Sequence, residues 1–413
     1  MSTPPRFAWW HEATPEARRA LVAASLGWML DSFDVMLYAL VLTALMGELG
    51  MTRGTAGLLG SLTLVASALG GVVFGVVADC HGRTRALTAS ILIYSVFTAA
   101  CGLSQSVVQL AVFRLLLGLG MGGEWASGAA LVSETWPARH RGKALGLMQS
   151  SWAVGYGLAA LVNLVVLPRF GWRAVFFVGV LPALVTFWIR RHVREPELWT
   201  RARAQDVATP RASLRAIFGR HALGLTLAVT AMNACTMFAW WGFNLWIPAY
   251  LSSPPGRGGI GLGPAAMSAF VIVMQVGMWF GYVTFGFVSD ALGRRRTYVA
   301  YLLTAAALVV AYANTSQPGL LLALGPIVAF FGTGYFSGFG AVTAEIYPTA
   351  VRATAQGLTY NIGRLASAVA PFAVGSLADT RGFAPALSMC AAAFVLAAAA
   401  WAWIPETRGR ALA

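Results

Sequence analysis

The strongest constraint on the fold is a series of long apolar runs, each of them long enough to cross a lipid bilayer. A hydrocarbon core about 30 Å thick needs about 20 helical residues at a rise of 1.5 Å per residue. The sequence contains about twelve runs of roughly 18–28 residues. We expect membrane-spanning helices at residues 20–46, 55–78, 86–105, 108–133, 143–167, 173–190, 222–250, 266–290, 298–315, 319–345, 354–378 and 384–404. Of the 413 residues, 58% are hydrophobic and 11% are charged, which excludes an ordinary soluble domain. The predicted fold class is an all-α membrane protein.

The basic residues predict the orientation of these helices. Residues 1–19 contain no cleavable apolar core, so we expect no secretory signal and an N-terminus that stays inside the cell. With that choice, 22 of the 29 Lys and Arg residues fall in segments on the cytoplasmic side, where short loops collect them. We therefore expect a multi-pass protein of the plasma (inner) membrane with both termini cytoplasmic. Attraction to anionic lipid explains the net charge of +14, and no nucleic-acid partner is expected.

The chain is predicted to consist of two equivalent halves. The long polar interval at 191–221 separates an N-terminal lobe at 1–190 from a C-terminal lobe at 222–413, and we interpret it as a basic cytoplasmic linker. A shift of 211 positions superimposes the loop motifs of the two halves, including Glu195 on Glu406. One constant offset indicates two parallel six-helix repeats, which rock about a site at their shared interface.

The most specific motif occurs once in each half. The segments GVVADCHGRTR (75–85) and GFVSDALGRRR (286–296) fit Gly-x-x-x-Asp-x-x-Gly-Arg-x-Arg. With this motif the chain resembles the major facilitator superfamily over essentially its whole length. The resemblance implies a charge network that closes the cytoplasmic side when the site faces outward; the alternative is that the motif only fixes loop conformation. The predicted gate residues are Gly75, Asp79, Gly82, Arg83, Glu134, Arg141, Gly286, Asp290, Gly293, Arg294, Glu345 and Arg352. The first glycine of each motif is expected to let a neighbouring helix approach closely.

Further segments resemble one branch of that superfamily. The stretch RLLLGLGMGGEWASGAALVSETWPARHRG (114–142) and the DSFD at 31–34 are similar to sialate and related carboxylate:proton symporters. Aromatic-acid:proton symporters are near relatives, although they usually have Gly at the position of Ser32. The resemblance implies transport of a small organic anion together with protons.

Three carboxylates and an arginine lie inside the predicted N-terminal helices. Asp31 and Asp34 are three residues apart, on one face of a helix, and Glu124 comes at a similar depth. A charge near the bilayer centre costs about 2.5–3.5 kcal/mol on insertion scales and normally faces a partner or a wet cavity. We predict that Asp31, Asp34, Glu124 and Arg114 couple protons to transport. The alternative is a structural ion pair between Arg114 and the aspartates.

Arg364 is the positively charged residue of the C-terminal half that we expect to bind substrate. Its planar guanidinium can hold a substrate carboxylate through two parallel hydrogen bonds. An anion that displaces an acid from Arg364 would favour protonation of that acid, which couples the two ligands. The alternative is a buried ion pair between Arg364 and one of the acids. The predicted substrate-binding residues are Arg364, Asn233, Asn361, Tyr360 and Trp125.

Several aromatic residues can either wall a cavity or simply pack. They are Trp28, Phe33, Trp125, Trp152, Tyr156, Trp240, Trp241, Phe243, Tyr335 and Tyr360. No phosphate-binding loop and no cluster of His and Cys in the spans is found, so we expect no enzyme, cofactor or metal. The predicted function is proton-coupled symport of a small organic acid by a monomer in the bilayer. The alternatives are a proton-driven exporter of drugs or metabolites and a nontransporting membrane sensor.

Overall fold

The computed structural model describes residues 10, 12–137, 140–195, 223–347 and 349–408. Helices account for the regular structure of these residues. They are α2 (Pro15–Leu49), α3 (Arg53–His81), α4 (Arg83–Cys101), α5 (Val107–Thr135), α6 (Arg141–Val178), α7 (Pro182–His192), α10 (Leu223–Ser252), α11 (Pro264–Leu292), α12 (Arg294–Ala313), α13 (Pro318–Thr333), α14 (Phe339–Ile346), α15 (Thr349–Ser367), α16 (Val369–Arg381) and α17 (Phe383–Ala400), with short 3-10 segments η1 (Pro255–Arg257) and η2 (Gly334–Gly338).

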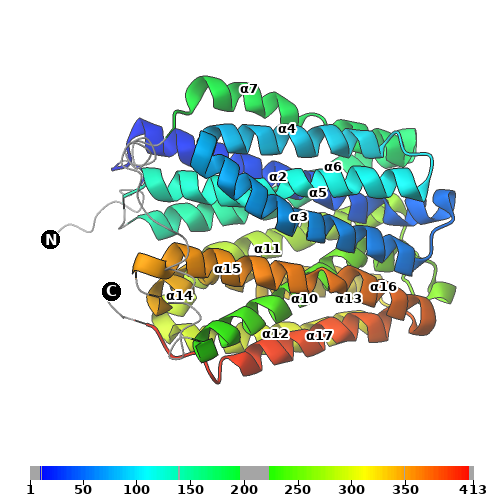
Figure 1. Ribbon diagram of the computed structural model, residues 1–413. Helices are drawn as coiled ribbons and strands as arrows, with labels where there is room; N and C mark the ends of the chain where they lie inside the picture. The colour runs from blue at the N-terminus through cyan, green and yellow to red at the C-terminus, as the bar shows by residue number, and fades with distance from the viewer. Residues whose placement is uncertain (1–9, 11, 138–139, 196–222, 348, 409–413) are drawn as a thin grey trace.

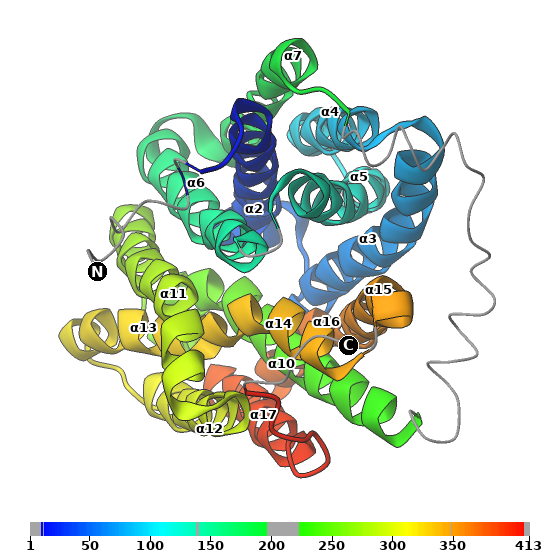
Figure 2. The same ribbon diagram turned by 90° about the vertical axis from the view of Figure 1, so that its left-hand side faces the viewer.

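The helices form two bundles that lie side by side (Figures 1 and 2). The N-lobe contains α2 to α7 and the C-lobe contains α10 to α17. Helix α2 begins and α17 ends at the same end of the bundle (Figure 1), as expected for two six-helix repeats in parallel orientation. We call this end, where α4 and α12 begin, the terminal face. The opposite end, where α3 and α11 begin, is the distal face. Most of the predicted linker at 191–221 lies outside the described residues.

Helix α2 shows how local sequence defines a span. The Thr14 hydroxyl caps its first turn by accepting a hydrogen bond from the Ala17 N–H at 3.2 Å. The helix ends at Gly50, whose φ of 65° is the left-handed conformation that glycine adopts without strain. Between them, α2 is buried on nearly all sides along residues 31–42, because other helices surround it.

The twelve predicted spans are present, but three of them are interrupted. Ten helical stretches among the described residues are long and apolar enough to be recognised as spans on their own. One of these stretches contains two spans that meet at Gly171, which has a φ of 76°. The span predicted at 354–378 is divided between α15 and α16 and is too polar in its first half to pass the same test. Span six breaks between α6 and α7, and span ten breaks at η2.

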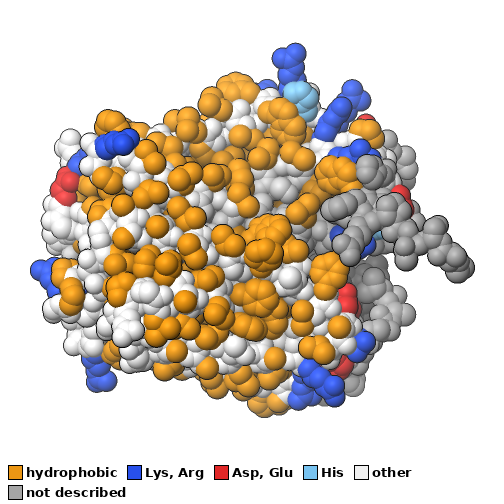
Figure 3. Space-filling model, turned by 180° about the vertical axis from the view of Figure 1, so that it is seen from behind, with side chains coloured by type: hydrophobic (Ala, Val, Ile, Leu, Met, Phe, Trp, Pro, Cys, Tyr) orange, Lys and Arg blue, Asp and Glu red, His pale blue; other side chains and the backbone are white. Residues whose placement is uncertain are grey.

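The surface confirms a membrane-embedded bundle. Hydrophobic side chains cover the middle of the face in Figure 3, whereas Lys and Arg gather at its two ends. The exposed side chains include Val72 at 64%, Phe187 at 70% and Phe287 at 73%, which would be unfavourable in water. The chain is a multi-pass integral membrane protein.

The repeat is visible in a pair of helix caps on the terminal face. The Glu195 carboxylate accepts hydrogen bonds from the backbone N–H groups of Thr84 and Arg85 at the start of α4. The Glu406 carboxylate accepts from Arg294 and Arg295 at the start of α12. A Cβ at Gly82 or Gly293 would lie 2.4 or 2.8 Å from these carboxylates, and both glycines have positive φ. Only glycine therefore fits each motif at this position.

The other predicted gate residues also lie on the terminal face. Arg83 donates to Glu134 at 3.0 Å, and Arg294 contacts Glu345 at 2.9 Å and Asp290 at 2.5 Å. The side chains of Asp79, Arg141 and Arg352 lie outside the described part of the chain.

The close helix approach expected at the first glycine of each motif is not made in this structure. A Cβ at Gly75 or Gly286 would meet no heavy atom within 4 Å. The close approaches of α3 are made at other glycines, at Gly57 toward Pro371 of α16 and at Gly70 toward Leu119 of α5.

Candidate functional site

The site is a small cavity between the lobes, lined by helices from both of them. Its volume is about 30 Å³, which holds one or two water molecules and is far below the roughly 300–1,000 Å³ of an open ligand pocket. The lobes must therefore move before a ligand enters. The lining residues are Trp28, Gln149, Trp152, Met237, Trp240, Trp241, Tyr282, Phe336, Tyr360 and Arg364.

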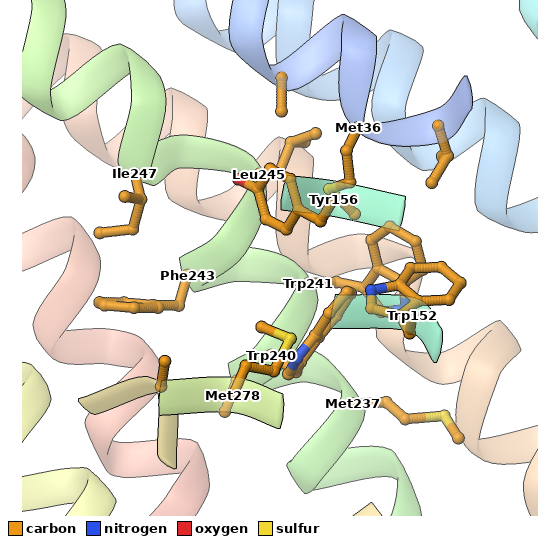
Figure 4. Packing of buried hydrophobic residues seen from close by; sticks show 14 of the residues in the cluster. Met36, Trp152, Tyr156, Met237, Trp240, Trp241, Phe243, Leu245, Ile247 and Met278 are labelled. Carbon is orange, nitrogen blue, oxygen red and sulfur yellow. The ribbon is translucent and has the colours of Figure 1, made fainter. Parts of the chain in front are cut away.

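Four tryptophans line the cavity and connect the lobes. Trp28 of α2 packs on Trp152 of α6 with ring centroids 4.6 Å apart. Trp152 in turn meets the edge of Trp240 and Trp241 of α10 at 5.6 and 6.2 Å, and Figure 4 shows these three rings together. Because the rings come from helices of both lobes, movement of one lobe against the other changes the shape of this wall.

Arg364 is the charged group of the cavity. It lies on α15 and is 4% exposed. It interacts electrostatically with Asp31 and Glu124 of the N-lobe. The alternative of a buried ion pair is not seen, because among the described residues no carboxylate lies within ion-pair distance of its guanidinium. Among the described residues, the positive charge at the lobe interface therefore has no direct ion-pair contact, although it lies in the field of Asp31 and Glu124.

The three buried carboxylates belong to the N-lobe and do not line the cavity. Asp31, Asp34 and Glu124 are each at most 1% exposed. Gly27 makes room for Glu124, because a Cβ at Gly27 would lie 2.5 Å from its Oε1 atom. Asp34 lies deeper in the lobe, beside the break between α6 and α7 at Gly179. Both carboxylate oxygens of Asp34 and of Glu124 lack a hydrogen-bond partner.

Ser32 anchors the helix that carries the two aspartates. Its hydroxyl donates a hydrogen bond of 2.7 Å to the backbone carbonyl of Trp152. The two backbones are close there, since a Cβ at Gly155 would lie 1.8 Å from the carbonyl oxygen of Met29. Ser32, the position at which the sequence departs from the aromatic-acid symporters, thus joins α2 to the cavity wall.

Arg114 does not pair with the aspartates, so the alternative of a structural ion pair between them is wrong. Its guanidinium lies over the Tyr38 ring, 3.8 Å from the centroid, and its Nε and Nη1 atoms have no hydrogen-bond partner. The reason is its position on α5: ten residues separate Arg114 from Glu124, about 15 Å along the helix axis. The arginine is therefore well toward the distal face.

Of the other predicted binding residues, Tyr360 lines the cavity, whereas Trp125, Asn233 and Asn361 do not. Trp125 stacks on Tyr360 at 4.3 Å between centroids, across the lobe interface. Asn361 lies beside Gly71 of α3, and Asn233 packs against Gly363 within the C-lobe.

Four lining residues are not predicted from the sequence, namely Gln149, Met237, Tyr282 and Phe336. An amide close to the start of a predicted span was the available signal for Gln149. The other three are ordinary apolar or aromatic residues in apolar runs, and only the fold distinguishes them.

Beyond the cavity, the lobes are joined toward the distal face. The Asp379 carboxylate of α16 accepts the backbone N–H groups of Arg53 and Gly54 at 3.2 and 2.8 Å, and so caps α3 from the other lobe. The Arg53 guanidinium donates to the carbonyl oxygens of Ala378 and Arg257 at 2.7 and 2.8 Å. We call this set of contacts the distal latch.

Comparison with known families gives one match over nearly all of the chain. Residues 24–283 and 257–412 match the Major Facilitator Superfamily. The chain is 35% identical over 420 residues to a probable 4-methylmuconolactone transporter of Cupriavidus pinatubonensis, covering 98% of this chain and 94% of that protein. It is 31% identical over 395 residues to a sialic acid transporter of Escherichia coli, covering 94% of each.

A solved structure supports the same fold. The crystal structure of a D-xylose–proton symporter superimposes with a TM-score of 0.76 at 21% identity, covering 96% of this chain and all of that one. At that identity the likeness concerns the arrangement of the helices.

Proposed function

Because the chain belongs to the Major Facilitator Superfamily, we propose that it is a secondary transporter that moves a small organic acid together with protons by alternating access. The observation that carries this proposal is Arg364, a buried cation at the lobe interface with no carboxylate in ion-pair contact. A planar guanidinium holds a carboxylate through two charge-assisted hydrogen bonds. An organic anion would supply the counter-charge that this group lacks.

The cavity wall favours a planar acid. Indole and phenol rings offer flat apolar faces, and they suit aromatic or conjugated acids better than acids covered with hydroxyl groups. The relative named for 4-methylmuconolactone is nearer to this expectation, whereas the relative named for sialic acid is named for an acid covered with hydroxyl groups, so the preference rests on the rings of the cavity wall. The proposed cargo is a planar monocarboxylate or a close analogue.

Protons are proposed to travel on the N-lobe carboxylates. An ionised carboxylate without hydrogen-bond partners is costly to bury, and a bound proton removes that charge. Asp31 and Glu124 lie in the field of Arg364. A substrate anion at Arg364 cancels that field, so anion binding favours proton binding on the opposite lobe. Asp34, next to Asp31, completes the proposed set; Arg114 has no contact with these acids that would support a direct role.

The orientation and the gate follow the same proposal. Arg83, Arg85, Arg294, Arg295 and Arg296 begin α4 and α12 on the terminal face, which is proposed to face the cytoplasm. Its charge networks around Arg83 and Arg294 are proposed to reinforce that side when the cavity opens outward.

Binding of matched ligands to matched variants tests the role of Arg364. Purified protein should bind benzoate but not benzamide, its neutral counterpart, in isothermal titration calorimetry. Arg364→Gln should weaken benzoate binding about 10- to 100-fold, because a bidentate charged pair is lost. Arg364→Lys keeps the positive charge but loses the two parallel donors of the guanidinium, so its affinity for benzoate should lie between those of wild type and Arg364→Gln. Equal affinity for benzoate and benzamide, or unchanged affinity in Arg364→Gln, would refute the proposal.

Transport in proteoliposomes tests the proton coupling and its direction. An inward proton gradient should accelerate uptake of labelled acid, and Asp31→Asn or Asp34→Asn should abolish that acceleration. Exchange of internal for external acid needs no net proton movement, so it should persist in an aspartate variant and serves as the control for folding. Acceleration of efflux instead of uptake would favour the exporter, and full coupling in both variants would exclude the aspartates.

A further inference from the structure

A second and larger cavity lies between the lobes at the distal face. Its volume is about 620 Å³, which is within the roughly 300–1,000 Å³ of ligand pockets, whereas the central cavity has about 30 Å³. The N-lobe contributes the end of α2 and the start of α3, and the C-lobe contributes the segment around η1 and the end of α16. Its lining residues Thr52, Pro254 and Arg257 are exposed, so the cavity opens to the distal solution. We call it the distal vestibule.

The charged residues that line the distal vestibule are Arg53, Arg257 and Asp379. Among the described residues, no carboxylate lies within ion-pair distance of either arginine. The Asp379 carboxylate attracts Arg53 and offsets part of the positive charge, but its oxygens already accept two backbone N–H groups of α3. Arg53 and Arg257 repel each other. The vestibule therefore has a net positive charge, which an anion would compensate.

The two guanidinium groups differ in how much of their hydrogen-bonding capacity is used. Arg53 donates to two backbone carbonyl oxygens of the distal latch and lies over the Phe383 ring, 4.3 Å from its centroid, so its position is fixed. Arg257 contributes its backbone carbonyl oxygen to the latch. Its guanidinium makes no hydrogen bond within the described part of the chain and is the group available to a ligand.

The rest of the vestibule favours an organic anion over an inorganic one. Met46 and Met51 line it on the side of the N-lobe, and their flexible apolar side chains suit the hydrocarbon part of an acid. A guanidinium binds a carboxylate through two parallel hydrogen bonds, which a spherical ion such as chloride cannot accept.

We propose that the distal vestibule is a second anion site, which takes a small organic carboxylate between Arg53 of the N-lobe and Arg257 of the C-lobe and thereby holds the distal side closed. Separation of the lobes would draw the two arginines apart and remove the ligand from one of them. A ligand that binds the closed state better than the open state shifts the population toward the closed state. One consequence rests on the proposed function: external acid at high concentration slows its own uptake.

Access to a buried cysteine measures this effect without any transport. Ser61→Cys lies between the lobes at a position 8% exposed and is made in a chain without its four native cysteines. The chain also carries Arg364→Gln, so that binding in the central cavity is weakened. A membrane-impermeant maleimide is added at the distal side with benzoate or with benzamide, at constant ionic strength. At ten times its Kd, benzoate should slow the labelling about 10-fold, and benzamide should not change it.

Matched variants of exposed arginines identify the site. Arg257→Gln should abolish the slowing by benzoate, because it removes the available guanidinium and leaves the backbone carbonyl of the latch in place. Arg257→Lys keeps the charge and should retain part of the slowing. Arg381→Gln is the control, because Arg381 is an exposed arginine at the end of α16 that does not line the vestibule. Each variant is compared with its own labelling rate without benzoate.

Uptake into proteoliposomes tests the consequence for transport. In the wild-type chain, the initial rate should pass through a maximum and then decline as the external concentration of acid rises. In Arg257→Gln, the rate should rise to a plateau instead. A decline of the same depth in both chains would show that the vestibule does not cause it.

The outcomes separate this inference from the proposed function. Equal slowing by benzoate and benzamide, slowing that persists in Arg257→Gln, or faster labelling with benzoate would each refute the vestibule site, whatever the central cavity binds. Conversely, a chain that transports no acid but shows slowing that depends on Arg257 would refute the proposed function and leave the vestibule site standing.

Discussion

The two faces of the molecule hold the helices together in different ways. Toward the distal face, hydrogen bonds join the two lobes. The hydroxyls of Thr43 and Ser252 share one, the Phe372 N–H donates to the Ser61 hydroxyl, and the Asn163 amide donates to the Ser268 hydroxyl. The distal latch adds the cap that Asp379 places on α3. On the terminal face, the described charge networks stay inside a lobe, with Arg83 on Glu134 in one and Arg294 on Glu345 in the other.

This difference assigns separate roles to the two faces in this conformation. The distal contacts hold the lobes against each other, and they must break when the distal side opens. The terminal networks fasten the ends of helices that already belong together, so they stabilise each lobe without resisting its rotation. Alternating access by rigid lobes needs both properties.

The largest expected effect comes from a methyl group added at the distal approach. A Cβ at Gly57 would lie 2.2 Å from the backbone oxygen of Pro371, which cannot move independently of α16. Gly57→Ala should shift the lobes toward the distally open state about 5- to 150-fold, since overpacking costs about 1–3 kcal/mol. The control is Gly75→Ala on the same helix, where the added atom meets open space.

The measurement uses a single cysteine between the lobes. Ser61→Cys, at a position 8% exposed, is made in a chain without its four native cysteines. A membrane-impermeant maleimide added at the distal side should label it faster in Gly57→Ala and at an unchanged rate in Gly75→Ala. Equal rates in both variants would show that the distal approach does not hold the lobes.

Loss of the distal cap comes second. Asp379→Ala removes the acceptor for two N–H groups of α3 and leaves the N-cap Thr52 in place; loss of a capping acceptor costs about 0.5–2 kcal/mol. Labelling of the cysteine at position 61 should therefore rise about 2- to 30-fold. Asp379→Asn keeps one acceptor oxygen, so its labelling rate should lie between the rates of wild type and Asp379→Ala. The same rise in labelling rate for both substitutions would show that the negative charge of Asp379, and not its capping hydrogen bonds, holds the lobes together.

Breaking a terminal network should lower stability without opening the distal side. Glu345 accepts Arg294 at 2.9 Å and the Thr407 hydroxyl at 2.5 Å. Glu345→Gln should lower the midpoint of thermal unfolding in detergent by about 2–4 °C, the shift expected for roughly 1 kcal/mol. Labelling at position 61 should not change. Labelling as fast as in Asp379→Ala would show that this network joins the lobes after all.

The smallest expected effect is a dependence of stability on acid pH. Burial alone would raise the pKa of Glu406, but backbone N–H groups of Arg408, Arg294, Arg295 and Thr407 outweigh it and lower the pKa below its ordinary value of 4.5. A lowered pKa in the folded state stabilises above the unfolded value, so stability should decline as pH falls below about 4.5.

This decline should be under about 1 kcal/mol, because Glu406 is mostly exposed to solvent. Thermal unfolding between pH 6 and pH 3.5 measures it. In Glu406→Gln, the midpoint of thermal unfolding should fall less with pH than in wild type. The same fall as in wild type would mean that other carboxylates cause the decline.

Much of the fold follows from the sequence because a bilayer permits few solutions. A span must satisfy its own backbone hydrogen bonds, so long apolar runs become helices. The repeat offset of 211 likewise predicted equivalent turns, and the caps at Gly82 and Gly293 confirm it. Breaks within spans were harder to predict: η2 and the junction of α15 with α16 lie in runs that read as continuous.

The site was only partly accessible from the sequence. Arg364 stands out in a polar stretch of an apolar span, and the structure places it at the cavity. The helical rise per residue places Asp31, Asp34 and Glu124 at about the same depth in the membrane. It does not tell which side of each helix faces the other lobe. The acids therefore appeared to share the cavity, whereas they lie within the N-lobe.

What the sequence alone determined is the class of molecule: an integral membrane protein of two parallel six-helix repeats, with charges inside the spans that need a partner. What only the tertiary structure decided is which groups meet. Whether a tryptophan packs or lines a cavity, and whether Arg114 meets Asp31 or Tyr38, depends on the rotation and separation of helices from two lobes. Residues far apart in the chain set those quantities jointly, so no local pattern encodes them.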